Sequence, residues 1–131
     1  METNIADLPS VNHSEIEIFK QIAQASSDGP VFMLNLNKYK VEADFPHGQL
    51  YKDYMAILDN LLDQVGGKIL WRTQVLGQVV GNQDIDEAIG IWYPTHQAFM
   101  NLMSAPSSGE NMRLRGLAVL QADLHRCKDY S

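Results

Sequence analysis

The chain has 131 residues and a formal net charge of −6, from 16 acidic and 10 basic residues. This length suits one domain with a hydrophobic core of its own. The negative charge argues against a nucleic-acid partner, because phosphate binding needs a clustered cationic face and the only basic cluster, Arg113 with Arg115, is small. The single cysteine, Cys127, excludes an internal disulfide and favours a reducing cytoplasm. No run of about 20 apolar residues and no export signal is visible, so we expect a cytoplasmic protein without a membrane partner.

A polar leader over residues 1–12 precedes the first expected helix. Ser14 and Glu17 have the spacing of a capping box, and the apolar stripe that follows predicts a helix over residues 14–25. We therefore divide the chain into a leader with an appended helix, residues 1–28, and one folded domain, residues 29–131.

The first half of that domain predicts a strand, a helix and a second strand. In the first strand, over residues 31–36, alternation puts Phe32, Leu34 and Leu36 on one face, which we assign to a helix-covered core. The other face then carries Met33, Asn35 and Asn37. Apolar residues at helical spacing over residues 50–65 predict a helix that ends at Gly66-Gly67. A strand over residues 68–76 follows, and Gly77 indicates a bulge or bend near its end.

The second half repeats the pattern. A third strand is expected over residues 88–93, and Thr95 can cap the helix that follows it. Residues 104–109 end that helix, and residues 110–117 predict another short helical turn. The last strand, over residues 119–126, alternates between two sets of residues: Val119, Gln121, Asp123 and His125 on one face, and Leu120, Ala122 and Leu124 on the other.

The order β-α-β-β-α-β predicts an α+β, ferredoxin-like fold: a four-stranded antiparallel sheet with both helices of the repeat on one face. The opposite face is then bare, and we expect Met33 and Val119 to lie on it. Contiguous exposed apolar surface of this kind usually marks an interface. Two such sheets facing each other across a two-fold axis would cover both, so we expect a homodimer.

The domain carries six short motifs: Gly29-Pro30-Val31, Met33-Leu34-Asn35-Leu36, Gly66-Gly67, Tyr93-Pro94, Ala98-Phe99 and Arg115-Gly116-Leu117. These motifs resemble a small bacterial family known as domain of unknown function 1330, within the dimeric α/β-barrel superfamily. The resemblance covers residues 29–126 and implies a ferredoxin-like protomer whose sheet forms a barrel with that of a second copy. Trp92, His96 and Ser107-Ser108 depart from the family pattern near the expected pocket.

The sequence shows no metal-ligand spacing, phosphate-binding glycine loop or nucleophile elbow, so we expect no cofactor. Asn35 interrupts an apolar strand, so its amide either orients a ligand or hydrogen-bonds to a facing protomer or buried water. Asp123 and His125 share a strand face, where the carboxylate can make His125 a general base or both can form a polar interface pair.

Four further residues are candidates for binding a substrate. Tyr54 can present its hydroxyl to a pocket or fill the core. Arg72 can bind a carboxylate or form an ion pair with Asp123 or another acid. Arg113 can hold an anion or be a solvated charge, and His96 stands in the first turn of a helix, where a surface position is the default.

Three functions are compatible with these residues. The superfamily resemblance implies a cofactor-independent monooxygenase or isomerase, acting on a small, partly aromatic or acidic metabolite in a pocket between sheet and helices. Tyr54, Phe99 and the tryptophans Trp71 and Trp92 would line that pocket. Some relatives in the superfamily degrade haem with Asn, Trp and His residues of the types found at Asn35, Trp92 and His96. The alternative is a non-catalytic module for ligand binding or assembly.

Overall fold

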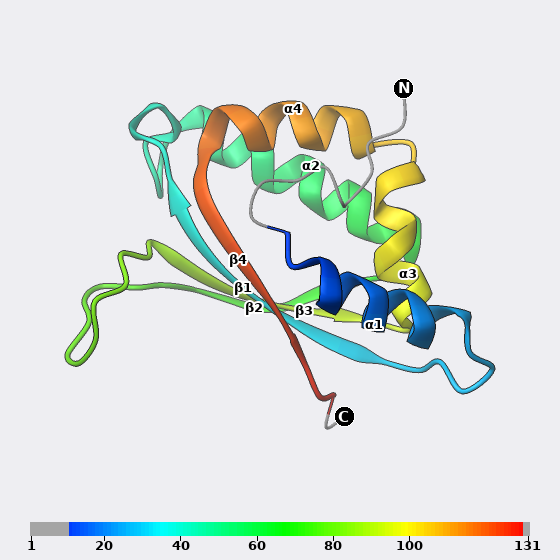
Figure 1. Ribbon diagram of the computed structural model, residues 1–131. Coiled ribbons are helices and arrows are strands. Elements are labelled where there is room, and N and C mark those ends of the chain that lie inside the picture. Colours follow the sequence, from blue (N-terminus) through cyan, green and yellow to red (C-terminus); the bar gives the residue numbers. More distant parts are fainter. Residues whose placement is uncertain (1–10, 130–131) are drawn as a thin grey trace.

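The computed structural model describes residues 11–129, so the predicted leader lies almost wholly outside the described part of the chain. Within that part the fold is α+β, with one four-stranded antiparallel sheet and its helices on one side (Figure 1). This confirms the fold class predicted from the sequence. The elements in chain order are α1 (His13–Gln24), β1 (Val31–Tyr39), η2 (Val41–Ala43), α2 (Gln49–Val65), β2 (Lys68–Gln74), β3 (Glu87–Tyr93), α3 (His96–Met100), η3 (Asn101–Ser104), α4 (Ser108–Ala118) and β4 (Val119–Cys127).

The strands lie in the order β2-β3-β1-β4, so β2 and β4 form the two edges of the sheet. The order follows from the alternation of strands and helices, because each crossover helix returns the chain to the same face. We call the covered side the helix face and the other side the open face. α1 joins the helix face through Phe19, whose ring lies 4.8 Å from the ring of Phe99 in α3.

The ends of two helices follow the predicted local chemistry. Gly66 ends α2 with a left-handed φ of 81°, and the N–H of Gly67 donates to the carbonyl of Leu62. At the start of α3, the hydroxyl of Thr95 accepts from the N–H of Ala98 at 3.0 Å. Both capping predictions are confirmed.

Two other local predictions are wrong. α1 is preceded by Asn12 and has no side-chain cap, so Ser14 and Glu17 form no capping box. The irregularity in β2 lies between Ile69 and Trp71 rather than at Gly77, which the strand does not reach. The short helical turn expected over residues 110–117 is confirmed as helical but is longer than predicted, since it is the helix α4.

The assignment of the two faces of β1 is also wrong, because it is reversed. Met33 is only 4% exposed and lies under the helices, with Val31, Asn37 and Tyr39. Phe32, Leu34 and Leu36 lie on the open face and are only partly buried. Counting apolar residues failed here because the helix face accommodates polar side chains that hydrogen-bond to one another, while the open face is itself apolar.

The prediction that Val119 lies on the open face is also wrong. The pairing of β1 with β4 shifts register between Lys38 and Tyr39, so Val119 lies opposite Tyr39 and is buried on the helix face. Beyond the shift, the alternation holds as predicted. Gln121, Asp123 and His125 lie opposite Lys38, Leu36 and Leu34 on the open face.

Candidate functional site

The sheet separates the predicted site residues into two groups. Trp71 and Trp92 lie opposite Gly90 and Lys68 on the open face, together with Asp123 and His125. Asn35, Tyr54 and Arg72 lie on the helix face. The pocket predicted between sheet and helices therefore cannot include the two tryptophans, because their side chains point to the other side of the sheet.

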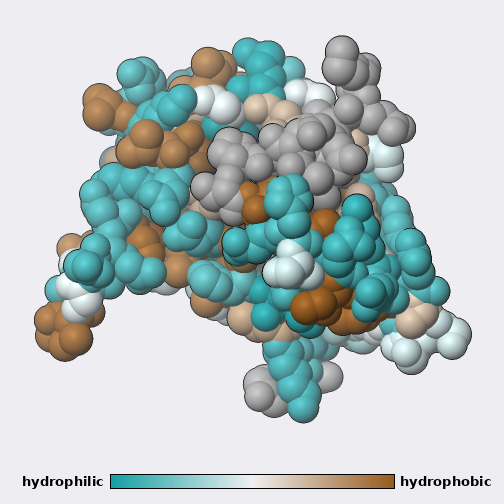
Figure 2. Space-filling view, viewed as in Figure 1, coloured by the Kyte–Doolittle hydropathy of each residue, from teal (hydrophilic) through white to brown (hydrophobic). Residues whose placement is uncertain are grey.

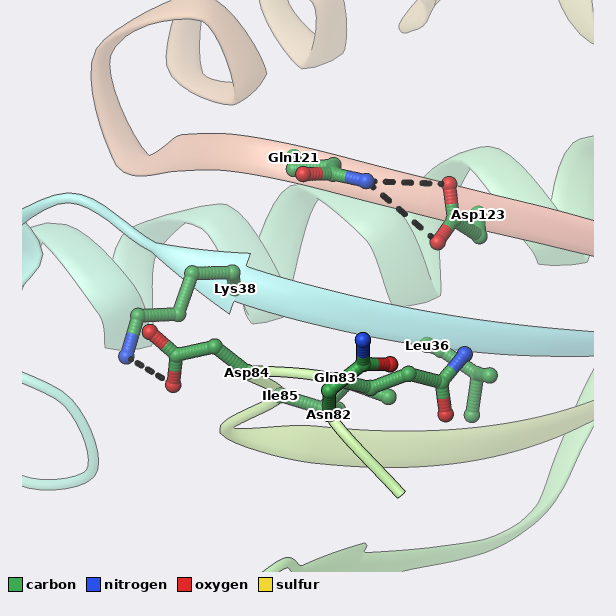
Figure 3. Close-up of a pocket in the computed structure, with 8 residues that line it drawn as sticks. All are labelled: Leu36, Lys38, Asn82, Gln83, Asp84, Ile85, Gln121 and Asp123. Atoms are coloured by element: carbon green, nitrogen blue, oxygen red, sulfur yellow. Dashed lines mark hydrogen bonds and ion pairs between the residues drawn. The ribbon is translucent and has the colours of Figure 1, made fainter.

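The open face ends in a hollow of about 370 Å³ (Figure 3). Leu36 and Lys38 of β1 form its floor, and Gln121 and Asp123 of β4 form one wall. The opposite wall is residues 82–85, which belong to the connection between β2 and β3. Residues far apart in the sequence thus enclose a mostly polar space.

The charges in this hollow are unequally engaged. The ammonium of Lys38 lies 3.0 Å from Asp84 Oδ1 and 3.3 Å from Asp86 Oδ1. Hydrogen bonds to Asp84 and then Asp86 raise the pKa of Lys38. Asp123, in contrast, accepts only long hydrogen bonds from Gln121 Nε2, at 3.4 and 3.5 Å. The carboxylate of Asp123 is therefore the charged group of the hollow that is best placed to bind a ligand.

The predicted partnership of Asp123 with His125 is not formed. The two residues share the open face, as expected from the alternation, but Asp123 is hydrogen-bonded to Gln121 instead. The imidazole of His125 is exposed beside it. A residue two positions along a strand is about 6–7 Å away, which is too far for a direct hydrogen bond.

An aromatic corner occupies the other end of the open face. The rings of Phe32 and Trp71 lie 6.2 Å apart on either side of Gly90. A Cβ at Gly90 would lie 2.5 Å from Trp71 Cε2 and 2.7 Å from Phe32 Cζ, so glycine is needed for both rings to rest on the sheet. Next to them, Lys68 Nζ lies 5.2 Å from the centre of the Trp92 ring, in a cation–π contact.

The helix face holds a buried carboxylate that sequence analysis missed. Glu87 is 4% exposed and accepts hydrogen bonds from the hydroxyls of Tyr39 at 2.6 Å and Tyr51 at 2.8 Å. Asn37 Nδ2 donates to the Tyr39 oxygen at 3.2 Å. The predicted strand began one residue too late, at residue 88. Extending the alternation of Ile89 and Ile91 back by one step would have placed Glu87 on the buried face.

The tyrosines of this layer are held neutral. Burial, and then the hydrogen bond to Glu87, raise the pKa of Tyr39 and of Tyr51. Burial raises the pKa of Tyr54 as well, against the opposing effect of the nearby Arg115 guanidinium. Tyr54 is thus a core tyrosine, the second of its two predicted roles. Among the described residues, Asn35 Oδ1 is buried without a hydrogen-bond partner.

The two predicted arginines have different surroundings. Arg72 lies on the helix face of the edge strand β2, where its charge partly offsets the raised pKa of Tyr51. An ion pair with Asp123 is impossible, because Asp123 lies on the opposite face of the opposite edge strand. Arg113 is exposed and paired with Glu110 at 2.6 Å.

His96 is buried and hydrogen-bonded to Asp28, so it is not the surface residue that was expected. Its backbone N–H and Nδ1 lie 2.9 and 3.0 Å from Asp28 Oδ1, and the N–H of Gln97 donates to the other oxygen. Burial alone would raise the pKa of Asp28, but these hydrogen bonds lower it overall. The structure does not bring together the three residues of the haem hypothesis, since Asn35 and Trp92 lie on opposite faces and His96 is engaged with Asp28.

Two features are absent from the described residues. Residues 11–129 contain no group of three or more His, Cys, Asp or Glu side chains placed to hold a metal ion. No helix in that range is long and apolar enough to cross a membrane.

Comparison with known proteins identifies relatives in structure without a described function. No family model and no curated protein matches the chain. The crystal structure of RPA0582, a protein of unknown function from Rhodopseudomonas palustris, is 26% identical with a TM-score of 0.71, over 98% of this chain and 99% of that one. Methylated RPA0582 matches at 27% identity and a TM-score of 0.69, over 88% and 91% of the two chains.

A plant protein shares the fold alone. At3g17210 from Arabidopsis thaliana is 12% identical, with a TM-score of 0.59 over 77% of this chain and 96% of that chain. The resemblance to the domain of unknown function 1330 family therefore rests on the sequence motifs.

Proposed function

We propose that this protein is a homodimeric module that binds a small polar molecule in the hollow on the open face. The observation that carries the proposal is the weakly engaged carboxylate of Asp123 beside a space of about 370 Å³. A space of this size is within the range of small-ligand sites.

The groups in the hollow indicate the kind of ligand. Asp123 accepts hydrogen bonds, while the side-chain amides of Asn82, Gln83 and Gln121 can both donate and accept. The partner of such a set is a molecule with hydroxyl or amino groups. Leu36 on the floor offers one apolar contact to a ring or a short aliphatic part.

The proposed dimer follows from the apolar side chains on the same open face. Within the described residues no helix covers Phe32, Leu34, Leu36 or the 43% exposed Trp71, so a single chain leaves these apolar side chains in contact with water. Pairing with a second copy buries them on both chains at once. The motif resemblance to a superfamily of dimeric barrels supports this arrangement.

Ligand-detected thermal shift tests the binding site. A panel of small hydroxy and amino compounds is screened against the protein, and we expect a compound that raises the melting temperature. Asp123→Asn should abolish that shift, whereas Asp59→Asn, which removes an exposed carboxylate on α2, should keep it. A ligand that still stabilises the Asp123→Asn variant would show that the site lies elsewhere.

A second candidate function is a cofactor-independent monooxygenase or isomerase on the helix face. It is favoured by the unpartnered oxygen of Asn35 in a layer that also holds the carboxylate of Glu87. Turnover of a panel of aromatic acids and lactones, with and without oxygen, tests this activity. Loss of turnover in Asn35→Ala but not in Asp123→Asn would favour the helix face, and no turnover of any compound would favour the binding module.

A further inference from the structure

We propose that the hollow is only half of its site, and that the second half is the aromatic corner of a second copy, held by reciprocal ion pairs between Lys68 and Asp123. The inference rests on the proposed homodimer and adds its geometry. It follows from where the charges lie on the open face.

The open face can be mapped from the strand register. Lys68, Trp92, Phe32 and Cys127 form a row across the four strands at one end. The row that holds Asp123 also holds Thr73, Ala88 and Leu36, and it lies four residues further along β1. Lys68 and Asp123 therefore occupy diagonally opposite corners.

The two rows and the two edge strands outline a rectangle on the open face, and its two sides are almost equal in length. Four residue steps along a strand span about 13 Å, and three strand spacings span about 14 Å. A two-fold axis that lies between two facing sheets and exchanges these corners therefore runs at about 45° to the strands. The strands of the two sheets then cross at about 90°, which is one of the two common ways in which sheets pack.

Charge decides between this axis and its alternatives. The other diagonal axis would place Lys68 against the second copy's own Lys68 and the two Asp123 carboxylates against each other, which is repulsive. Axes parallel or perpendicular to the strands place Lys68 and Asp123 opposite the positions of Cys127 or Thr73 and not opposite each other. Only the corner-exchanging axis makes two attractive contacts, and it passes over the apolar centre at Gly90 and Leu34.

This arrangement completes the hollow. Lys68 lies against Trp92 at 5.2 Å, and Trp71 lies beside the same corner, so the corner that reaches Asp123 brings aromatic rings with its charge. These rings then cover the open side of the hollow in the first copy. The two oxygens of Asp123 are then shared between the second copy's Lys68 and the ligand. The ligand is a molecule with hydroxyl or amino groups at one end and a flat apolar part at the other.

Charge reversal tests the pairing by sedimentation velocity over a range of concentrations. Lys68→Glu and Asp123→Lys should each raise the dissociation constant of the dimer by about tenfold or more, because each sets like charges against each other. The double variant restores opposite charges and should return the constant close to the wild-type value. Lys52→Glu and Asp59→Lys, on the exposed side of α2, are the matched controls and should change nothing.

Tryptophan fluorescence gives a second measurement, since the chain has two tryptophans and both lie on the open face. Acrylamide should quench them less as the dimer forms, and the single reversals should restore the quenching. A wild-type protein that stays monomeric overturns both this inference and the proposed homodimer. If the wild-type protein is a stable dimer but the single reversals do not change its dissociation constant, or the double variant does not restore it, the corner pairing is overturned. The proposed homodimer is then unaffected.

Discussion

The two faces of the sheet combine polarity and burial in opposite ways. The helix face carries polar side chains, Asn37, Tyr39 and Glu87, yet it is buried, because each of them is hydrogen-bonded within the layer. The open face carries Phe32, Leu34 and Trp71, yet none of the described helices covers it. Apolar content alone therefore does not tell which side of a sheet is the interior.

A third surface, the connection between β2 and β3, is also apolar and exposed. The connection between β2 and β3 projects beyond the body of the protein, and its tip is apolar (Figure 2). Leu76, Val79 and Val80 are almost completely exposed there. They belong to the connection that leaves β2, the edge strand that also carries Trp71.

The largest difference is expected between neighbours in β1. Met33→Ala removes a side chain from the packed helix face and should lower the free energy of unfolding by about 2–5 kcal/mol. Leu34→Ala, on the open face, should lower it clearly less in the monomer but weaken the dimer. Urea unfolding at low concentration, with sedimentation at high concentration, separates the two effects. Equal losses for both variants would mean that the two faces are equally buried within one chain.

Alkaline pH should act mainly on the helix face, with a smaller contribution from Lys38 on the open face, whose pKa is also raised. The pKa values of Tyr39, Tyr51, Tyr54 and Tyr93 are raised, mainly by burial, so above pH 10 the unfolded chain ionises its phenols while the folded chain does not. Stability is therefore complete below about pH 10 and falls as pH rises, by up to about 1.4 kcal/mol per tyrosine per pH unit. Urea unfolding between pH 9 and 11 measures the slope, and Tyr51→Phe should make it shallower. A slope unchanged by that substitution would contradict the neutral state of Tyr51.

Glu87→Gln tests the hydrogen-bonded network directly. Glutamine offers one carbonyl oxygen in place of two carboxylate oxygens, so one of the two tyrosine hydroxyls loses its acceptor. We expect a loss of about 1–3 kcal/mol in urea unfolding near neutral pH. Glu110→Gln, at an exposed carboxylate on α4, is the control and should have little effect. A stable Glu87→Gln variant would mean that water replaces the carboxylate, and that the helix face is less closed than its burial indicates.

Most of the fold was predictable because it is encoded locally. Alternation predicted the strands, helical spacing predicted α2, and Gly66 and Thr95 marked helix ends through their own backbone and side-chain chemistry. Right-handed crossovers then left one sheet topology. The faces of β1 were not predictable in the same way, because the partners that bury Asn37 are Tyr39 and, through it, Glu87.

The candidate site was harder to predict for the same reason. Asp123 was recognised from its strand, but the hollow beside it needs residues 82–85, which fold back from a connection without periodic signal. Asp28 was missed as a partner of His96, since 68 residues separate them. Contacts across such separations depend on the packed structure and not on a local pattern.

The smallest expected effect concerns this last contact, which ties α3 to the segment after α1. Hydrogen bonds lower the pKa of Asp28 overall, so the carboxylate stabilises the fold above its ordinary pKa and loses that contribution as pH falls through the folded-state value. Asp28→Ala should lower the free energy of unfolding by about 1 kcal/mol at pH 7, in the range of a lost helix cap, and by much less at pH 3. Asp59→Ala serves as the exposed control at both pH values. If Asp28→Ala lost the same stability at pH 3 as at pH 7, the contact would act through packing against His96 rather than through its negative charge.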